Sequence, residues 1–198
     1  EDDYEEPESV QVDIVQGDLV TFECEDSRVH RLLCGDSTCS DTVEKLMDGL
    51  TEFSIYTDPP YGINEKGDRS KRGGLAKANN LKDFKDDSIQ YAVDAYNITR
   101  QYKVKKEIWW GANYYCHHLP QGNNWVQDGH SSVRIFRHLW KGMIKASEHG
   151  EKRIHPTQKP VALGVYCFRE YKMGDYILDL FGGSGSSMVA CETIGISC

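Results

Sequence analysis

The sequence of 198 residues lacks any apolar run of the roughly 18 residues needed to cross a bilayer, and no signal peptide is recognisable. Its seven cysteines are odd in number and scattered, which argues against a disulfide framework and favours reduced thiols in a cytoplasmic protein. Zinc-ligand spacing is missing too, because Cys116, His117 and His118 are adjacent and would point in different directions. We expect a globular protein without metal, of one domain with or without a small appendage.

A net positive charge is also lacking, because 31 acidic residues outnumber 23 lysines and arginines. The formal net charge is −8, which taken alone argues against nucleic acid as a ligand. Six of the acidic residues lie within residues 1–8, however, so the rest of the chain carries only about −2. An acidic start of this kind is typical of a linker, and we predict a linker over residues 1–10 followed by a folded domain over 11–198. DNA therefore stays open as a partner.

The most informative stretch is a short strand that stops at two prolines. Residues 53–57 are β-branched and aromatic, and Asp58-Pro59-Pro60-Tyr61 follows, where the prolines cannot continue a ladder. Ligands bind at such carboxyl ends in open α/β sheets. Asp58 and the Pro59 carbonyl could accept N–H bonds from the exocyclic amino group of a base, and Tyr61 could stack on its ring for about 1–3 kcal/mol. The alternative is a turn whose Asp and Tyr only cap and pack.

The segments before this stretch predict a second strand end. Residues 10–24 alternate loosely around a Gln-Gly-Asp turn and predict a small hairpin. A strand over 31–34 is followed by a Gly-Asp-Ser turn and a helix over about 40–50. Asp36 therefore lies at another strand's carboxyl end, although Asp36 or Ser37 could instead serve as the N-cap of the helix.

The middle of the chain contains a basic loop and a segment of uncertain structure. The loop would neutralise DNA phosphates beside the base pocket, although most short charge runs are only solvated surface. Its basic residues are Lys66, Arg69, Lys71, Arg72 and Lys77. The pattern then predicts a helix over 83–102, a buried strand over 107–111 and a polar, aromatic turn over 113–118. Residues 121–150 are irregular apart from a strand over 133–140, and a target-reading insertion is expected there.

The carboxyl-terminal part has the pattern of a cofactor-binding unit. A helix over 161–171, with Pro160 at its first position, precedes a buried strand over 176–180. A glycine-rich turn over 181–186 and a helix over 187–195 follow, and glycines let such a backbone approach a nucleotide-like cofactor. A nicotinamide-dependent oxidoreductase is disfavoured, because Met188 stands where a dinucleotide fingerprint has its third glycine.

Taken together, these segments resemble the β-class DNA amino-methyltransferases, which use S-adenosylmethionine to methylate the exocyclic nitrogen of adenine or cytosine. Asp58-Pro59-Pro60-Tyr61 is similar to their catalytic motif, residues 155–160 (His-Pro-Thr-Gln-Lys-Pro) to the segment before the cofactor half, and residues 180–186 to the cofactor loop. Residues 34–37 resemble an upstream turn whose acid faces the cofactor's adenine. The resemblance implies a doubly wound, Rossmann-like α/β sheet, circularly permuted with the catalytic half first, and a target-recognition segment near 112–150.

The same resemblance implies roles for individual residues. Asp58, Pro59, Pro60 and Tyr61 would hold the target amino group after the base is flipped out of the duplex. No covalent enzyme intermediate is needed, so the cysteines are not candidate nucleophiles. The residues implied in S-adenosylmethionine binding are Asp36, Ser37, Asp58, Thr157, Lys159, Asp179, Phe181, Gly182, Gly183, Ser184, Gly185 and Ser186.

Adenine N6 is the predicted target, because in this family Asp in the first motif position goes mainly with adenine and Ser mainly with N4-cytosine. N4-cytosine, RNA and a catalytically inactive DNA-binding subunit of a modification complex are the alternatives. The acidic start and residues 30–37 resemble phage and prophage members, which often carry an upstream ParB-like domain. The expected partner is double-stranded DNA in a bacterial or phage-infected cytoplasm, with a homodimer left open.

The sequence also departs from the family pattern. After the cofactor loop the family has a further strand with an acidic residue, and this strand is not found here. The family's Trp-x-x-Trp-Asp-Lys pattern is also missing at residues 125–128. The basic loop is short as well. We therefore expect segments of the family's chain to be absent near 66–78, near 127–131 and after 198.

Overall fold

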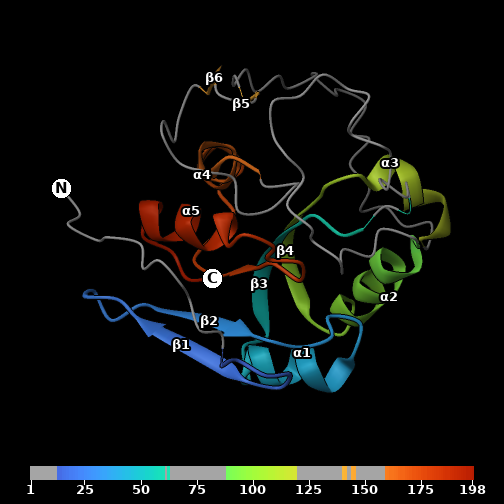
Figure 1. The fold of residues 1–198 in the computed structure, drawn as a ribbon, viewed down its shortest axis with the longest axis horizontal. Helices are drawn as coiled ribbons and strands as arrows, with labels where there is room; N and C mark the ends of the chain where they lie inside the picture. Colours follow the sequence, from blue (N-terminus) through green and yellow to red (C-terminus); the bar gives the residue numbers. More distant parts are fainter. Residues whose placement is uncertain (1–12, 61, 63–87, 120–139, 142–143, 146–158) are drawn as a thin grey trace.

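A computed structural model of the chain describes residues 13–60, 62, 88–119, 140–141, 144–145 and 159–198 (Figure 1). The elements in chain order are β1 (Leu19–Glu23), β2 (Val29–Leu33), α1 (Ser40–Met47), β3 (Glu52–Thr57), α2 (Gln90–Thr99), β4 (Lys103–Trp109), α3 (Ala112–Tyr115), the 3₁₀ helix η2 (Cys116–His118), β5 (Trp140–Lys141), β6 (Ile144–Lys145), α4 (Val161–Glu170), β7 (Ile177–Leu178) and α5 (Ser186–Ile194). Among these helices, none has the length and apolar character of a membrane span.

The centre of the fold is a parallel sheet of three strands in the order β4-β3-β7. β3 pairs with β4 from Glu52↔Lys103 to Thr57↔Trp109, with one irregularity after Phe53. On its other side β3 pairs with β7 through Ser54↔Ile177 and Ile55↔Leu178. Because the strands are parallel, their carboxyl ends emerge at one edge, which is where the predicted catalytic and cofactor turns begin. The prediction of an α/β fold is confirmed.

Helices cover both faces of this sheet, because side chains of a strand alternate between its faces. Phe53 and Ile55 of β3 belong to one core cluster, with buried residues of α1 and α2. Tyr56 belongs to the other cluster, with α4 and α5, and its ring meets the Phe168 ring edge-on at 4.9 Å. Figure 1 shows α2 and α5 on opposite sides of β3 and β4. Burial of each such large apolar side chain contributes about 1.5–3 kcal/mol.

A separate antiparallel hairpin, β1–β2, lies beside this sheet, in register from Leu19↔Leu33 to Glu23↔Val29. Residues after α5 connect the two sheets: Ser197 forms a parallel bridge with Tyr176, and the Arg31 N–H donates to the Cys198 carbonyl at 2.8 Å. A hollow of about 670 Å³ remains between hairpin and sheet. Apolar side chains of α1 and the sheet line part of it, among them Leu46, Met47, Leu50, Phe53 and Leu178.

The predicted hairpin within residues 10–24 is wrong. The Gln-Gly turn at 16–17 exists, but it only leads into β1, whose partner is β2. The hairpin turn itself lies at 24–28, where the Cys24 N–H donates to the Arg28 carbonyl at 2.9 Å. Local alternation shows that a segment is a strand, but it does not identify the strand with which it pairs.

Other predicted elements differ from the structure mainly at their ends. The helix expected over 40–50 ends at Met47, because Asp48 adopts a left-handed conformation. The helix expected over 83–102 is described from Gln90 to Thr99. Pro160 is the N-cap of α4 and not its first residue. The strand expected over 176–180 pairs with β3 only at Ile177 and Leu178.

Two predictions between 103 and 118 need a larger correction. β4 begins at Lys103 and not at 107, and its first half is largely exposed, so only its end is a buried strand. The expected polar turn over 113–118 is helical, formed by α3 and η2. The predicted linker over 1–10 and most of the recognition segment near 112–150 lie outside the described residues, and both stay predictions.

Candidate active site at the carboxyl edge of the sheet

Two turns that are distant in sequence meet at the carboxyl edge of β3 and β7. The register Ile55↔Leu178 is the last backbone pair between these strands. Beyond it, the Leu180 N–H donates to Thr57 Oγ1 at 3.2 Å, so a side chain continues the contact where the ladder stops. The Asp58 turn therefore starts next to the glycine-rich turn, in a place typical of ligand binding in α/β proteins.

Asp179 organises the beginning of the glycine-rich turn. Its Oδ1 accepts hydrogen bonds from the Thr57 hydroxyl at 2.9 Å and from the Phe181 N–H at 3.1 Å. Its Oδ2 accepts from the Ser187 hydroxyl of α5 at 2.6 Å. Although Asp179 keeps some exposed surface, its carboxylate lies among protein atoms, and this loss of hydration raises the pKa of the Asp179 carboxyl. The three hydrogen bonds act in the opposite direction, because they favour the charged form.

Asp58 follows β3 directly and forms an ion pair with Lys159, which immediately precedes the N-cap of α4. Both side chains are partly buried. The pair therefore brings the Asp-Pro-Pro turn together with the end of the His-Pro-Thr-Gln-Lys-Pro segment. The predicted roles of these residues toward a base and a cofactor stay predictions. Pro59 is fully buried, which fixes the backbone immediately after the carboxylate.

Tyr115 at the end of α3 and Trp110, which follows β4, lie near Asp58 and the end of β3. Tyr115 is fully buried, and its hydroxyl donates to the Trp110 carbonyl at 3.0 Å. Burial, and after it the nearby charge of Asp58, raises the pKa of Tyr115. The Trp110 N–H in turn donates to the Thr57 carbonyl at 3.0 Å. The end of β3 is thus fixed from both neighbouring strands.

The glycine-rich turn has a conformation that suits a bound cofactor. Gly183 and Gly185 have φ of 54° and 76°, a region that side chains disfavour, and the Gly185 N–H closes the turn on the Gly182 carbonyl at 2.8 Å. A Cβ built at Gly182 or Gly185 would meet no described atom within 4 Å. The turn is held from inside through Leu180 and Phe181, and its glycine part faces open space. The turn therefore leaves room for a ligand beside its backbone.

Asp36 lies at the end of β2 and is exposed. Its Oδ1 accepts from the Thr38 N–H at 2.8 Å and from the Thr38 hydroxyl at 2.6 Å, and these bonds lower the pKa of Asp36. The alternative that Asp36 or Ser37 is the N-cap of α1 is wrong, because Cys39 occupies that position without a side-chain cap bond. The predicted contact of Asp36 with a cofactor is not tested by this geometry and stays a prediction.

Several predicted site residues lie outside the described part of the chain. They are Tyr61, Thr157 and the five basic residues Lys66, Arg69, Lys71, Arg72 and Lys77. Conversely, no pattern in the sequence indicates Thr57, Tyr115 or Ser187 as residues of this site. Thr57 and Ser187 look like an ordinary strand residue and helix residue, and only the three-dimensional structure brings both to Asp179.

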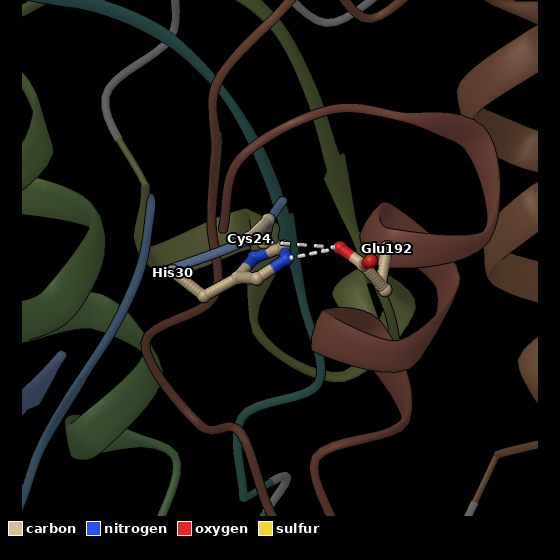
Figure 2. Close-up of side chains that lie close together, drawn as sticks. All are labelled: Cys24, His30 and Glu192. Carbon is tan, nitrogen blue, oxygen red and sulfur yellow. Dashed lines mark hydrogen bonds and ion pairs between the residues drawn. The ribbon is translucent and has the colours of Figure 1, made fainter. Parts of the chain in front are cut away.

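A second cluster of polar side chains joins the hairpin to α5 (Figure 2). The Cys24 thiol, His30 Nε2 and Glu192 Oε2 lie within 4.8 Å of one another, a donor set that zinc accepts. Glu192 Oε2 accepts from Cys24 at 3.3 Å, from Arg28 at 3.0 Å and contacts His30 Nε2 at 2.9 Å. His30 Nδ1 accepts the Cys198 N–H at 3.1 Å, so Nε2 holds the proton and donates it to Glu192.

That tautomer decides the nature of the cluster. A metal on Nε2 would displace its proton, and Nδ1 could take that proton up only by losing its hydrogen bond from the Cys198 N–H. The Arg28 charge would also lie beside the metal. The four residues are therefore best described as a hydrogen-bonded clasp, named here the Glu192 clasp (Cys24, Arg28, His30 and Glu192), which ties the hairpin to α5.

Comparison with known families gives one match. A family model described as DNA methylase matches residues 75–198, which is more than half of the chain. The matched range contains Lys159, the glycine-rich turn and α5, whereas Asp58 precedes it. No curated protein and no solved structure matches the chain.

Proposed function

The chain belongs to the DNA methylase family of the N6/N4 type, and from this premise we propose that it transfers a methyl group from S-adenosylmethionine to the N6 amino group of adenine in double-stranded DNA. One observation carries the proposal beyond the family match. The Asp58 turn and the glycine-rich turn meet at one edge of the sheet, through Thr57, Asp179 and Leu180. A methyl acceptor at the first turn and a donor at the second would then be neighbours.

The acceptor side is built to hold an amino group. An exocyclic amino nitrogen is a poor nucleophile, because its lone pair is delocalised into the ring. Asp58 and the Pro59 carbonyl would each accept one of its N–H bonds and draw the nitrogen towards tetrahedral geometry, while Tyr61 stacks on the base. Lys159 holds one oxygen of the Asp58 carboxylate in place. Catalysis would consist of positioning and hydrogen bonding, without a covalent enzyme intermediate.

The donor side would be formed by the glycine-rich turn with Lys159, Thr157 and Asp36. S-adenosylmethionine supplies an activated methyl group: a nitrogen–carbon bond forms as the sulfur–carbon bond breaks. The methylated amino group then releases one proton, and the Asp58 carboxylate is an acceptor in place for it. The strand of the catalytic turn precedes that of the glycine-rich turn in the chain, and we include the permuted β-class order in the proposal.

DNA is the proposed partner, and its base would have to leave the duplex at a cost of a few kcal/mol. The five basic residues between 66 and 77 would contact phosphates, so binding should weaken steeply with salt. Since the substrate is DNA, the proposed location is the cytoplasm of a bacterial or phage-infected cell. A homodimer, an upstream ParB-like domain and a role in restriction–modification belong to the same proposal.

Product analysis tests this function directly. The protein is incubated with S-adenosylmethionine carrying a labelled methyl group and with unmethylated genomic DNA, and the DNA is then digested to nucleosides. The expected product is labelled N6-methyldeoxyadenosine. Labelled N4-methyldeoxycytidine would show that cytosine, not adenine, is the methylated base. DNA binding without any label in the DNA would identify an inactive subunit.

A further inference from the structure

Thr57 lies between the two turns of the proposed site. It is the last residue of β3, is 0% exposed, and immediately precedes Asp58. Its carbonyl accepts a hydrogen bond from the backbone N–H of Trp110, just after β4, at 3.0 Å. On the β7 side the backbone ladder has already ended at Ile55↔Leu178. Beyond that pair, the Thr57 hydroxyl makes hydrogen bonds that join the two strand ends.

That hydroxyl uses both of its hydrogen-bonding functions across the strand boundary. It donates to Asp179 Oδ1 at 2.9 Å and accepts the Leu180 N–H at 3.2 Å. A hydroxyl has only one proton, so the two bonds fix its orientation. Asp179 in turn holds the Phe181 N–H and the Ser187 hydroxyl. Hydrogen bonds therefore connect Thr57, through Asp179, to the beginning of the glycine-rich turn and to the first turn of α5.

We propose that Thr57 is a positioning residue that sets the spacing between the Asp58 turn and the glycine-rich turn, and so between methyl acceptor and methyl donor. This inference rests on the proposed function. Group transfer depends on near-attack geometry, and a displacement of about 1 Å can lower a rate by about 100-fold. Thr57 itself need not touch either substrate.

A purely structural role for a buried threonine is the competing explanation, and matched variants separate the two. Thr57→Val keeps the β-branched shape but removes the hydroxyl, and Thr57→Ser keeps the hydroxyl. Thr99→Val is the control, because Thr99 is also 0% exposed. Its hydroxyl donates to the Tyr96 carbonyl within α2 and accepts from the neighbouring Arg100 side chain, in another part of the molecule. Both valine variants lose one buried hydroxyl, but only one breaks the link between the turns.

The expected result is a loss in kcat of about 10- to 100-fold for Thr57→Val, with KM for DNA close to wild type. Thr57→Ser should restore kcat, and Thr99→Val should leave it unchanged despite a comparable loss of thermal stability. Equal kcat for wild type and Thr57→Val would overturn the inference. So would a loss that Thr99→Val reproduces in proportion to its lower melting temperature.

A second readout does not depend on activity. Hydrogen exchange of the Leu180 and Phe181 amides, measured without DNA, should be faster in Thr57→Val and near wild type in Thr57→Ser and Thr99→Val. Unchanged exchange in Thr57→Val would contradict the link. If Thr57→Val does not fold, Thr57→Ala serves in the exchange experiment, because it also removes the hydroxyl that donates to Asp179 and accepts the Leu180 N–H. Unchanged protection at Leu180 and Phe181 in Thr57→Ala would likewise contradict the link.

The two failures are distinguishable. Wild-type protein that binds DNA but never methylates it would remove the proposed function, and the positioning role with it. Active wild type together with an equally active Thr57→Val would remove only the positioning role.

Discussion

Two carboxylates in this protein each accept three hydrogen bonds, at least one of them from a distant part of the chain, yet their environments differ. Asp179, at the sheet edge, is bound by two hydroxyls and one backbone N–H, all neutral donors. Glu192, in the clasp, is bound by a thiol, an imidazole and the charged guanidinium of Arg28. The Asp179 carboxylate is surrounded by protein, whereas 54% of the Glu192 side chain is exposed.

The pKa values of the two carboxyls therefore shift in opposite directions. Burial raises the pKa of Asp179, whereas the hydrogen bonds from His30, Cys24 and Arg28 lower the pKa of Glu192 to about 2. The number of hydrogen bonds is the same, so hydration and the charge of the donors decide the sign. From this difference we expect the Asp179 region to serve the proposed function and the Glu192 clasp to serve stability.

The strongest test of that division is Asp58→Ala compared with Glu192→Ala. Removal of the Asp58 carboxylate should abolish methyl transfer, with a loss of at least about 100-fold, because the amino group loses its acceptor. Affinity for S-adenosylmethionine, measured by calorimetry, should largely survive. Glu192→Ala should retain the wild-type rate at a temperature where it is folded. Parallel loss of cofactor affinity and activity in Asp58→Ala would contradict its role as a base-holding group.

Asp179→Ala should have the largest effect on stability. It leaves the buried hydroxyls of Thr57 and Ser187 and the Phe181 N–H without an acceptor, at a cost of roughly 3 kcal/mol in the free energy of unfolding. Urea denaturation measures the change. Glu192→Ala is the matched control, and its effect should be clearly smaller, because water replaces the lost partners of an exposed carboxylate.

The pH dependence of stability should differ between the two regions. The pKa of Glu192 lies near 2 in the fold against an ordinary value of 4.5, so its contribution is complete above pH 4.5 and is lost as the pH falls towards 2. The stability difference between wild type and Glu192→Gln, followed by denaturant unfolding from pH 6 to pH 2, should shrink in that window. For Asp179 the pH dependence is reversed: its pKa is raised in the fold, so its contribution to the free energy of unfolding increases as the pH falls.

A difference that grows with acid for Glu192→Gln would show that the clasp does not hold an ionised carboxylate in solution. Asp179→Asn gives the contrast within the same protein. Its difference from wild type should grow as the pH falls from neutral, because only the wild-type side chain takes up a proton.

The smallest effect is expected from zinc. If the clasp is a hydrogen-bonded unit, adding Zn²⁺ should leave the melting temperature unchanged, because His30 Nε2 is engaged as a donor. Ligand binding to the native state alone would raise it. A rise in melting temperature with zinc that is lost in Cys24→Ser but kept in the control Cys34→Ser would show that these residues form a metal site.

Much of the sheet edge could be predicted because its signals are local. Two prolines end β3, and glycines with positive φ shape the turn before α5, so residues 53–60 and 181–186 were identified from the sequence. The ion pair of Asp58 with Lys159 joins two segments that the sequence assigns to one site, but the pairing itself was not predicted. The hairpin was predicted wrongly, because β1 finds its partner outside the stretch that showed the alternation.

The sequence by itself determined which segments form the strands and tight turns of the site, since prolines and glycines limit the backbone wherever they stand. Only the tertiary structure decided which side chains meet. Thr57 and Asp179 are 122 residues apart, and His30 and Glu192 are 162 apart, so no local pattern records either contact. Burial and donor charge are likewise properties of the folded molecule, and they gave two similar carboxylates opposite pKa shifts.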